Sequence, residues 1–235
     1  MIAPPRPRVA LVVAAGGSGR RMGGAIGVRK QYLELAGEPV LVHALRPFLA
    51  LPELRWVVVA LPRQDAGDPP DWLVQLDARL RVVAGGAERT DSVRAALSAV
   101  PPEADVVLVH DAARPLVTLD LIARVIEAAW AGSAAIPGVA VEDTIKEVDE
   151  SGTVLGTVDR GRLRRVQTPQ GFRRELLLEA HRRAQADGAA ATDDAALVER
   201  IGGRVVVVEG SAENVKITGP QDLVLAEAIL RRRGA

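Results

Sequence analysis

Short apolar runs alternate with longer amphipathic stretches along the 235 residues of this chain. The short runs are rich in valine and nearly free of polar residues, which is typical of strands buried on both faces of a parallel sheet. They predict strands over residues 9–14, 56–61, 80–83, 106–109, 134–141 and 204–208. The amphipathic stretches predict helices over residues 39–50, 71–77, 91–100, 119–131, 174–187, 193–201 and 220–232.

This regular alternation is the pattern of an α/β fold, a doubly wound and mostly parallel sheet with helices on both faces. We expect a single domain over residues 1–235. Three of the predicted helices begin beside side chains that can cap a first turn, namely Thr90 or Asp91, Thr118, and Thr192.

The segment over residues 142–169 departs from this pattern. Two stretches of alternating polarity, TIKEV and TVLGTV, flank a polar turn over residues 149–152. They predict an extended β-hairpin arm. An arm of this length has few partners in its own domain, so it packs either on a neighbouring subunit or back onto its own chain. The pattern alone leaves both arrangements open.

Composition narrows the classes of function. Lys plus Arg and Asp plus Glu number 30 each and only 3% of residues are aromatic, so the basic surplus and stacking side chains of a general nucleic-acid binder are missing. The absence of cysteine excludes disulfides and thiolate chemistry, and three histidines argue against a histidine-rich zinc site. Because no apolar run approaches the ~18 residues of a membrane span, we expect a cytoplasmic protein that binds no membrane.

A glycine-rich loop, AAGGSGRRMGG over residues 14–24, follows the first predicted strand. Ligands of open parallel sheets bind beyond the carboxyl ends of the strands, and glycines let main-chain N–H groups face phosphate oxygens. The dinucleotide fingerprint fails because Met22 stands at its last glycine. The phosphate loop of P-loop proteins fails because Ala25 stands where it needs lysine. A plain tight turn with two solvated arginines is the alternative.

Further motifs follow in order along the chain: KQY at 30–32, GEPVL at 37–41, GGAERTDSV at 85–93, VHDAARP at 109–115, EDTIK at 142–146, TVDR at 157–160, QTPQGF at 167–172, TDD at 192–194 and NVKIT at 214–218. With the glycine loop, this ordered set resembles the 2-C-methyl-D-erythritol 4-phosphate cytidylyltransferase family of sugar-phosphate nucleotidyltransferases, which serves the non-mevalonate isoprenoid pathway. The resemblance covers residues 9–230.

The resemblance implies a nucleotidyltransferase Rossmann-like fold, CTP and methylerythritol phosphate as substrates, and a homodimer formed through the arm. It also implies Mg²⁺, which screens the triphosphate and favours departure of pyrophosphate. No covalent nucleophile is needed, because alignment and positive charge can bring two anions together.

The resemblance also implies roles for individual residues. The catalytic residues are Arg21, Lys30, Arg160 and Lys216, and losing Arg21 or Lys30 would raise the barrier by roughly 3–4 kcal/mol. The nucleotide-binding residues are Ala14, Ala15, Gly16, Gly17, Gly19, Gly86, Ser92, Asp111 and Ala112. The residues for the methylerythritol phosphate are Arg114, Thr144, Arg160, Thr168, Thr192 and Lys216. The metal ligand is Asp111.

Several of these interpretations have rivals. The loop is one residue longer than the family pattern, so Arg20 competes with Arg21, and Arg29 stands where the family usually has proline. Ser92 would bind cytosine or only decorate its helix. Asp111 ends a buried strand, where a carboxylate is costly unless it meets a cation or a hydroxyl.

Alternative functions are a ribitol phosphate cytidylyltransferase, a nucleotidyltransferase that uses another base, and a nucleotide-binding regulatory protein without turnover.

Overall fold

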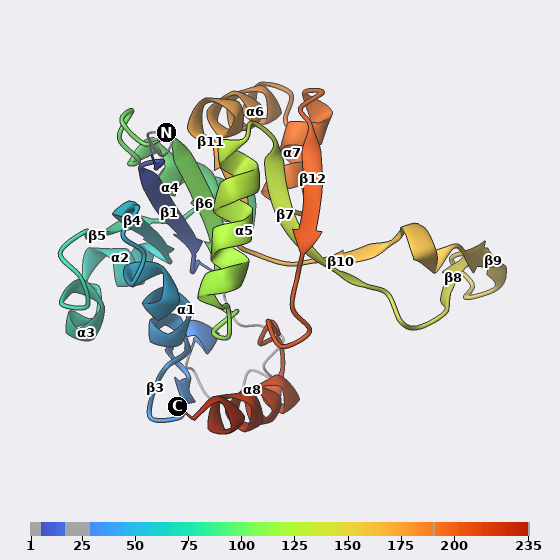
Figure 1. Ribbon diagram of the computed structural model, residues 1–235, viewed down its shortest axis with the longest axis horizontal. Helices are drawn as coiled ribbons and strands as arrows, with labels where there is room; N and C mark the ends of the chain where they lie inside the picture. Colours follow the sequence, from blue (N-terminus) through green and yellow to red (C-terminus); the bar gives the residue numbers. More distant parts are fainter. Residues whose placement is uncertain (1–5, 17–28, 190, 235) are drawn as a thin grey trace, which may run out of the picture.

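The computed structural model describes residues 6–16, 29–189 and 191–234, with Lys30 described by its main chain only. Figure 1 shows a twisted central sheet with helices packed on it and a thin arm that projects from one side. Six strands of the sheet run parallel: β1 (Val9–Ala14), β4 (Leu54–Leu61), β5 (Leu80–Ala84), β6 (Val106–Asp111), β7 (Ala134–Ala140) and β12 (Val205–Glu209). Two further strands are antiparallel to these six: β11 (Gln170–Arg173) lies between β6 and β7 and pairs with both, and β10 (Arg164–Val166) pairs with β7. The predicted mostly parallel sheet is confirmed.

Helices cover both faces of the sheet because successive side chains of each strand point to opposite faces. Leu11 and Val13 of β1 pack with α1 (Val40–Leu49) and α5 (Leu119–Trp130). Val12, between them, packs on the other face, whose helices are α4 (Arg89–Ser98), α6 (Arg174–Ala186) and α7 (Asp194–Arg200). These fully buried valines and leucines explain why the strands read as unbroken apolar runs.

Smaller elements surround the carboxyl ends of the strands. They are the 3-10 helix η2 (Lys30–Tyr32), the strand pair β2 (Glu34–Leu35) and β3 (Glu38–Pro39), and the short helices α2 (Arg63–Gly67) and α3 (Asp71–Val74). The last helix, α8 (Pro220–Arg233), packs its buried residues against Leu35 and Ile217 in a separate apolar cluster.

The predicted arm is confirmed as a hairpin of β8 (Ile145–Val148) and β9 (Val154–Val158). Its turn is held by the Asp149 carboxylate, which accepts from the main-chain N–H groups of Ser151 and Thr153 at 2.9 Å each. The expected extent of 142–169 was too long. Residues 164–166 pair with β7 as part of the central sheet, and Gln167 and Thr168 are buried.

Two of the predicted helix caps were wrong and one is confirmed. Helix α4 is capped by Glu88 rather than by Thr90 or Asp91, because the Glu88 N–H donates to the Asp91 carboxylate in a reciprocal capping box. Helix α7 is capped by Asp193, which accepts from the Ala196 N–H at 3.0 Å, rather than by Thr192. Thr118 caps α5 as expected.

Within the described part of the chain, the helices are too short or too polar to cross a membrane.

Candidate active site

The strand order reverses between β1 and β6. From β1 the chain adds β4 and then β5 on one side, and it returns with β6 on the other side of β1. Such a reversal is where ligands of open α/β sheets bind. Ala14 pairs with Asp111 at the carboxyl ends, and the Ala112 N–H donates to the Ala14 carbonyl at 3.3 Å. Ala15 and Gly16 continue β1 directly from this point.

Ser92 of helix α4 lies against the glycines that follow β1 and β5. Its hydroxyl accepts from the Gly86 N–H at 3.2 Å and donates to the Glu88 carbonyl at 3.1 Å, so it fastens the loop before its own helix. A Cβ on Gly16 would stand 3.0 Å from the Ser92 Oγ, and one on Gly86 would stand 2.2 Å from the Asp91 Cβ. A side chain at position 86 would therefore force the backbone or Asp91 to move, and one at position 16 would crowd the Ser92 hydroxyl. The structural role foreseen for Ser92 is observed, and its role toward cytosine stays a prediction.

Asp111 stands between two cations at the end of β6. Its Oδ1 lies 3.0 Å from Arg89 Nε, and its Oδ2 lies 2.6 Å from Lys216 Nζ. Burial by itself raises the pKa of the Asp111 carboxyl, but the charges of Arg89 and Lys216 outweigh burial and hold that pKa well below its ordinary value. The expectation that this carboxylate must meet a cation is confirmed. The Lys216 side chain is 38% exposed and forms the solvent-facing end of the group.

Arg89 also binds a second carboxylate deeper in the protein. Its Nη1 lies 2.7 Å from Asp194 Oδ2, and Asp194 Oδ1 lies 3.0 Å from His181 Nε2. Burial works against the charge of Asp194, yet the His181 hydrogen bond and the Arg89 charge lower the pKa of its carboxyl. Burial likewise works against the charge of Arg89, but Asp194 and Asp111 raise the pKa of its guanidinium.

The motifs GGAERTDSV and TDD contain Arg89 and Asp194, but the sequence alone assigns neither residue a role. In the structure Arg89 is the first residue of helix α4, where the helix dipole disfavours a cation. The sequence pattern predicted that helix to begin only at residue 91, so it did not reveal this feature.

Thr168 and Arg114 are joined to the same rim by hydrogen bonds. The Asp111 N–H donates to the Thr168 hydroxyl at 3.1 Å, and Arg114 Nη1 donates to the Asn214 carbonyl at 2.7 Å. The Asn214 side chain in turn donates to the Thr168 carbonyl at 2.9 Å, two residues before Lys216. Burial lowers the pKa of the Arg114 guanidinium.

The buried His110 ring is hydrogen-bonded to two members of this network. Its Nδ1 lies 3.1 Å from the Thr168 hydroxyl and its Nε2 lies 3.1 Å from the Arg114 carbonyl. Burial lowers the pKa of the imidazole to about 4, so the ring is neutral at pH 7.

The remaining predicted residues fall into three groups. Thr144 and Arg160 are exposed on the arm, which in Figure 1 extends away from the sheet, so one chain by itself does not bring them to Asp111. Thr192 is exposed and lies two residues before Asp194. Gly17, Gly19, Arg21 and the competing Arg20 lie outside the described residues, as does the side chain of Lys30.

The segment that contains Lys30 is nevertheless fastened to the end of β1. The Gln31 amide nitrogen, which is buried, donates to the Ala15 carbonyl at 2.9 Å. The residue next to Lys30 in η2 is therefore fixed at the end of β1.

The donor set at the rim suits one kind of metal ion. In the described part of the chain, no group of three or more His, Cys, Asp or Glu residues could hold a metal. Asp111 is a single carboxylate at the switch point. Mg²⁺ binds through one or two carboxylates together with substrate phosphates, so these residues fit Mg²⁺ that arrives with a nucleotide.

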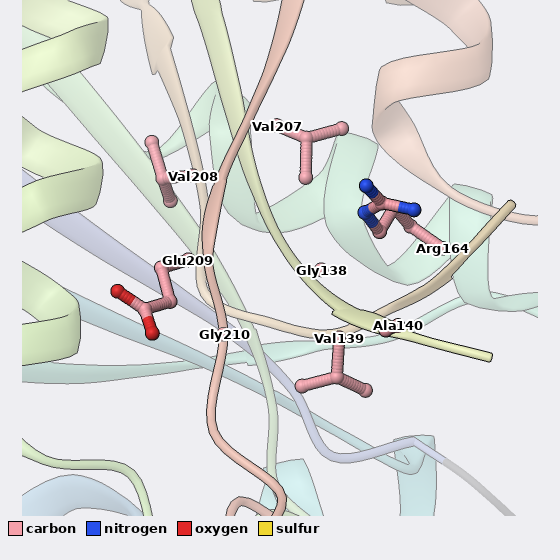
Figure 2. Close-up of a pocket in the computed structure, with 8 residues that line it drawn as sticks. All are labelled: Gly138, Val139, Ala140, Arg164, Val207, Val208, Glu209 and Gly210. Atoms are coloured by element: carbon pink, nitrogen blue, oxygen red, sulfur yellow. The ribbon is translucent and has the colours of Figure 1, made fainter. Parts of the chain in front are cut away.

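A hollow of about 460 Å³ opens at the base of the arm (Figure 2). Its lining comes from the ends of β7 and β12 and from Arg164 of β10, and Figure 2 shows the Arg164 and Glu209 side chains on opposite sides of the β12 strand. None of the predicted site residues lines this hollow.

The family model described as 2-C-methyl-D-erythritol 4-phosphate cytidylyltransferase matches residues 9–232. A protein of that name from Syntrophus aciditrophicus is 44% identical over 97% of this chain and 97% of its own length. Another of that name, from Symbiobacterium thermophilum, is 48% identical over 94% of this chain and 92% of its own length. The crystal structure of the Thermus thermophilus protein of that name matches with a TM-score of 0.79 and 39% identity, and it covers 94% of this chain and 98% of the other.

Proposed function

This chain belongs to the 2-C-methyl-D-erythritol 4-phosphate cytidylyltransferase family, and we propose on that premise that the rim around Asp111 and Lys216 is where its two substrates meet. The enzyme transfers a cytidylyl group from CTP to 2-C-methyl-D-erythritol 4-phosphate in the non-mevalonate pathway of isoprenoid synthesis. The products are 4-diphosphocytidyl-2-C-methyl-D-erythritol and pyrophosphate.

The chemistry is a displacement at the α-phosphorus of CTP. An oxygen of the methylerythritol phosphate forms a new bond to that phosphorus, and the bond to the bridging oxygen of the pyrophosphate breaks and leaves its electron pair with pyrophosphate. Attacking and attacked groups are both anionic, so the protein must supply positive charge and alignment. The observation that carries the assignment is the pairing of Asp111 with Arg89 and Lys216 at the strand-order reversal.

The residues divide between the two substrates. The pyrimidine lies against the main chain of Ala14, Ala15, Gly16 and Gly86 and beside the Ser92 hydroxyl, because residues with small or no side chains let a flat ring approach the backbone closely. Arg21 and Lys30 supply charge at the α-phosphate. Lys216, Arg114 and Thr168 bind the methylerythritol phosphate, joined by Thr192 and by Thr144 and Arg160 from an arm. The hydrogen bonds that already join Arg114, Thr168 and the Lys216 segment support this division.

Mg²⁺ is part of the proposal, with Asp111 as the protein ligand. When bound, the ion neutralises triphosphate charge and favours departure of pyrophosphate. The protein's own contribution is a carboxylate kept ionised at the rim by Arg89 and Lys216. We also propose that the enzyme acts in the cytoplasm, where CTP is available.

The arm is proposed to form a homodimer. Val148, Val154 and Leu155 of the hairpin are each more than half exposed, which is unusual for valine and leucine. The hairpin forms a two-stranded sheet of its own, apart from the central one. A second copy of the chain would cover these side chains and receive Thr144 and Arg160 in its site.

A substrate panel tests the reaction. Purified protein is assayed for pyrophosphate release with CTP, UTP, GTP or ATP, each against methylerythritol phosphate and ribitol phosphate, with and without Mg²⁺. We expect release only with CTP and methylerythritol phosphate in the presence of Mg²⁺. Release with ribitol phosphate or another nucleotide would change the substrate assignment. Binding of CTP without turnover on either polyol phosphate would indicate a regulatory protein.

A further inference from the structure

A continuous chain of contacts between ionisable side chains, the ionic chain, runs from the protein interior to the rim of the proposed site. It begins at His181 of helix α6, passes through Asp194 of α7 and Arg89 of α4, and reaches Asp111 at the end of β6. Lys216 forms its outer end. The four contacts measure 3.0, 2.7, 3.0 and 2.6 Å in this order. Residues far apart in sequence are thus joined into one rigid row that ends at the proposed binding site.

The inner half of this chain is costly for the fold. Asp194 has no exposed surface and His181 is 3% exposed. A buried charge pair is expensive to desolvate, and apolar residues of similar size are often as stable or more stable in its place. Helices α4, α6 and α7 already share an apolar core here, including Val93, Leu177 and Leu197. Packing alone therefore gives no reason for a carboxylate at position 194.

The geometry of Arg89 gives that reason. Its guanidinium binds Asp194 through Nη1 and Asp111 through Nε, so one planar group fixes the orientation of two carboxylates. Asp194 balances part of the Arg89 charge on the interior side. The Asp111 carboxylate therefore needs only one oxygen for Arg89, and its other oxygen and much of its negative charge interact with Lys216. Without Asp194, the full charge of Arg89 would fall on Asp111 and compete with Lys216 for it.

We propose that Asp194 is a positioning residue for cytidylyl transfer, which holds Arg89 so that Asp111 and Lys216 are presented to the substrates in fixed register. This inference rests on the proposed function, since it takes Asp111 and Lys216 to belong to the site. Asp194 itself touches no substrate and acts through Arg89.

The first test is Asp194→Asn, with Asp193→Asn as its matched control. Both changes remove one negative charge at the start of α7. Asp193 binds Ala196 N–H and Gln170 rather than Arg89, and asparagine caps a helix about as well as aspartate. We expect Asp194→Asn to lower kcat by on the order of ten- to a hundredfold. The KM for CTP should change little, since main-chain groups hold the base. Asp193→Asn should stay near wild type.

A second variant keeps the test decisive if Asp194→Asn folds poorly. Arg89→Lys retains the charge but has no fork with which to hold two carboxylates at once. We expect a loss of kcat comparable to that of Asp194→Asn, measured on protein that circular dichroism shows to be folded, together with a lower thermal unfolding midpoint because one buried carboxylate loses its partner. Wild-type kcat in a folded Arg89→Lys or a folded Asp194→Asn protein would overturn the proposal.

Coupling with Lys216 separates positioning from a purely structural effect. If Asp194 acts through the chain, adding Asp194→Asn to Lys216→Ala costs little more than Lys216→Ala alone, because the end of the chain is already lost. If the fold-losses in kcat of the two single variants multiply in the double variant, the inference is overturned. Full activity of Lys216→Ala alone would instead refute the proposed assignment of the site, so the two failures are distinguishable.

Discussion

Two neighbouring buried residues of β6, His110 and Asp111, differ in charge: the carboxylate is ionised and the imidazole is neutral at pH 7. Asp111 is buried but remains charged, because Arg89 and Lys216 lie within 3.0 Å of its oxygens. His110 has no exposed surface, and burial outweighs the charge of neighbouring Asp111 and lowers the pKa of its imidazole to about 4. The neutral ring donates its Nε2–H to the Arg114 carbonyl and accepts at Nδ1 from the Thr168 hydroxyl. The free energy of unfolding should therefore depend on pH because of His110.

The direction of this pH dependence follows from the number of protons that the folded and unfolded states bind. The pKa of His110 is about 4 in the folded state, below its ordinary value of 6.5, so the unfolded chain binds more protons between these pH values. The contribution that the neutral His110 makes to the free energy of unfolding is fully present above pH 6.5. It is lost as the pH falls toward 4, and the total loss is about 3 kcal/mol.

Urea unfolding at steps from pH 7.5 to 5, in metal-free buffer, measures this loss. His110→Asn should be less stable at pH 7.5 but should lose less stability on acidification than the wild type. Equal slopes for the two proteins would show that His110 does not control this part of the pH dependence.

At the scale of residues, sequence reasoning found one end of the ionic chain and missed the other. The end of a buried strand marked Asp111 as a carboxylate in need of a cation, and Lys216 came from the motif resemblance. Arg89 and Asp194 pair across 105 positions of sequence, and only the fold, which places α4 and α7 on the same face of the sheet, brings them together. A pattern of neighbouring residues in the sequence cannot reveal a contact between residues so far apart in the chain.

At the scale of elements, the 3-10 helix η2 is held from two sides. Gln31 binds the Ala15 carbonyl, and the Tyr32 hydroxyl donates to the Asp65 carboxylate of α2 at 2.8 Å. Arg29 adds an ion pair to the same carboxylate at 3.2 Å. Arg29 stands where the family pattern usually has a proline, and its contact with α2 restrains the approach to Lys30 by another means.

We therefore expect Asp65→Ala to disturb the segment of Lys30. Its loss removes both the Tyr32 hydrogen bond and the Arg29 ion pair, which are partly exposed and together worth ~1 kcal/mol. The kcat should fall by about three- to tenfold with little change in the KM for CTP. Steady-state kinetics measure both values. Asp68→Ala, at an exposed carboxylate just after α2, serves as the control and should match wild type. A wild-type kcat in Asp65→Ala would mean that this anchor does not restrain Lys30.

The elements that sequence reasoning missed share a physical cause. Strands β1, β4 and β6 are buried on both faces, so their valine runs identify them without outside information. Strand β10 reads RRV and is exposed along its length, and it forms only because β7 offers it main-chain partners. The short helix α2 buries none of its residues and was missed for the same lack of an apolar pattern.

At the scale of the whole molecule, the site proposed here is divided between two regions of the chain. Lys216, Asp111 and Arg89 gather at the sheet, whereas Arg160 follows strand β9 in the arm that Figure 1 shows projecting from the sheet. Two arrangements would unite them. Either the arm of a second subunit supplies Arg160, or the arm folds back onto its own sheet.

Mixing two inactive variants distinguishes these arrangements. If Arg160 acts in the neighbouring subunit, a heterodimer of Arg160→Ala with Lys216→Ala contains one site that lost both residues and one that retains both. Random reassembly makes half of the dimers mixed, so about a quarter of wild-type activity should return on mixing under exchange conditions. Each variant alone should stay inactive, and the double variant mixed with either should restore nothing. If the arm serves its own chain, every site keeps its own defect and mixing restores no activity. Because charge removed from one chain is replaced only by the other, recovery would require both a dimer and an arm that crosses it.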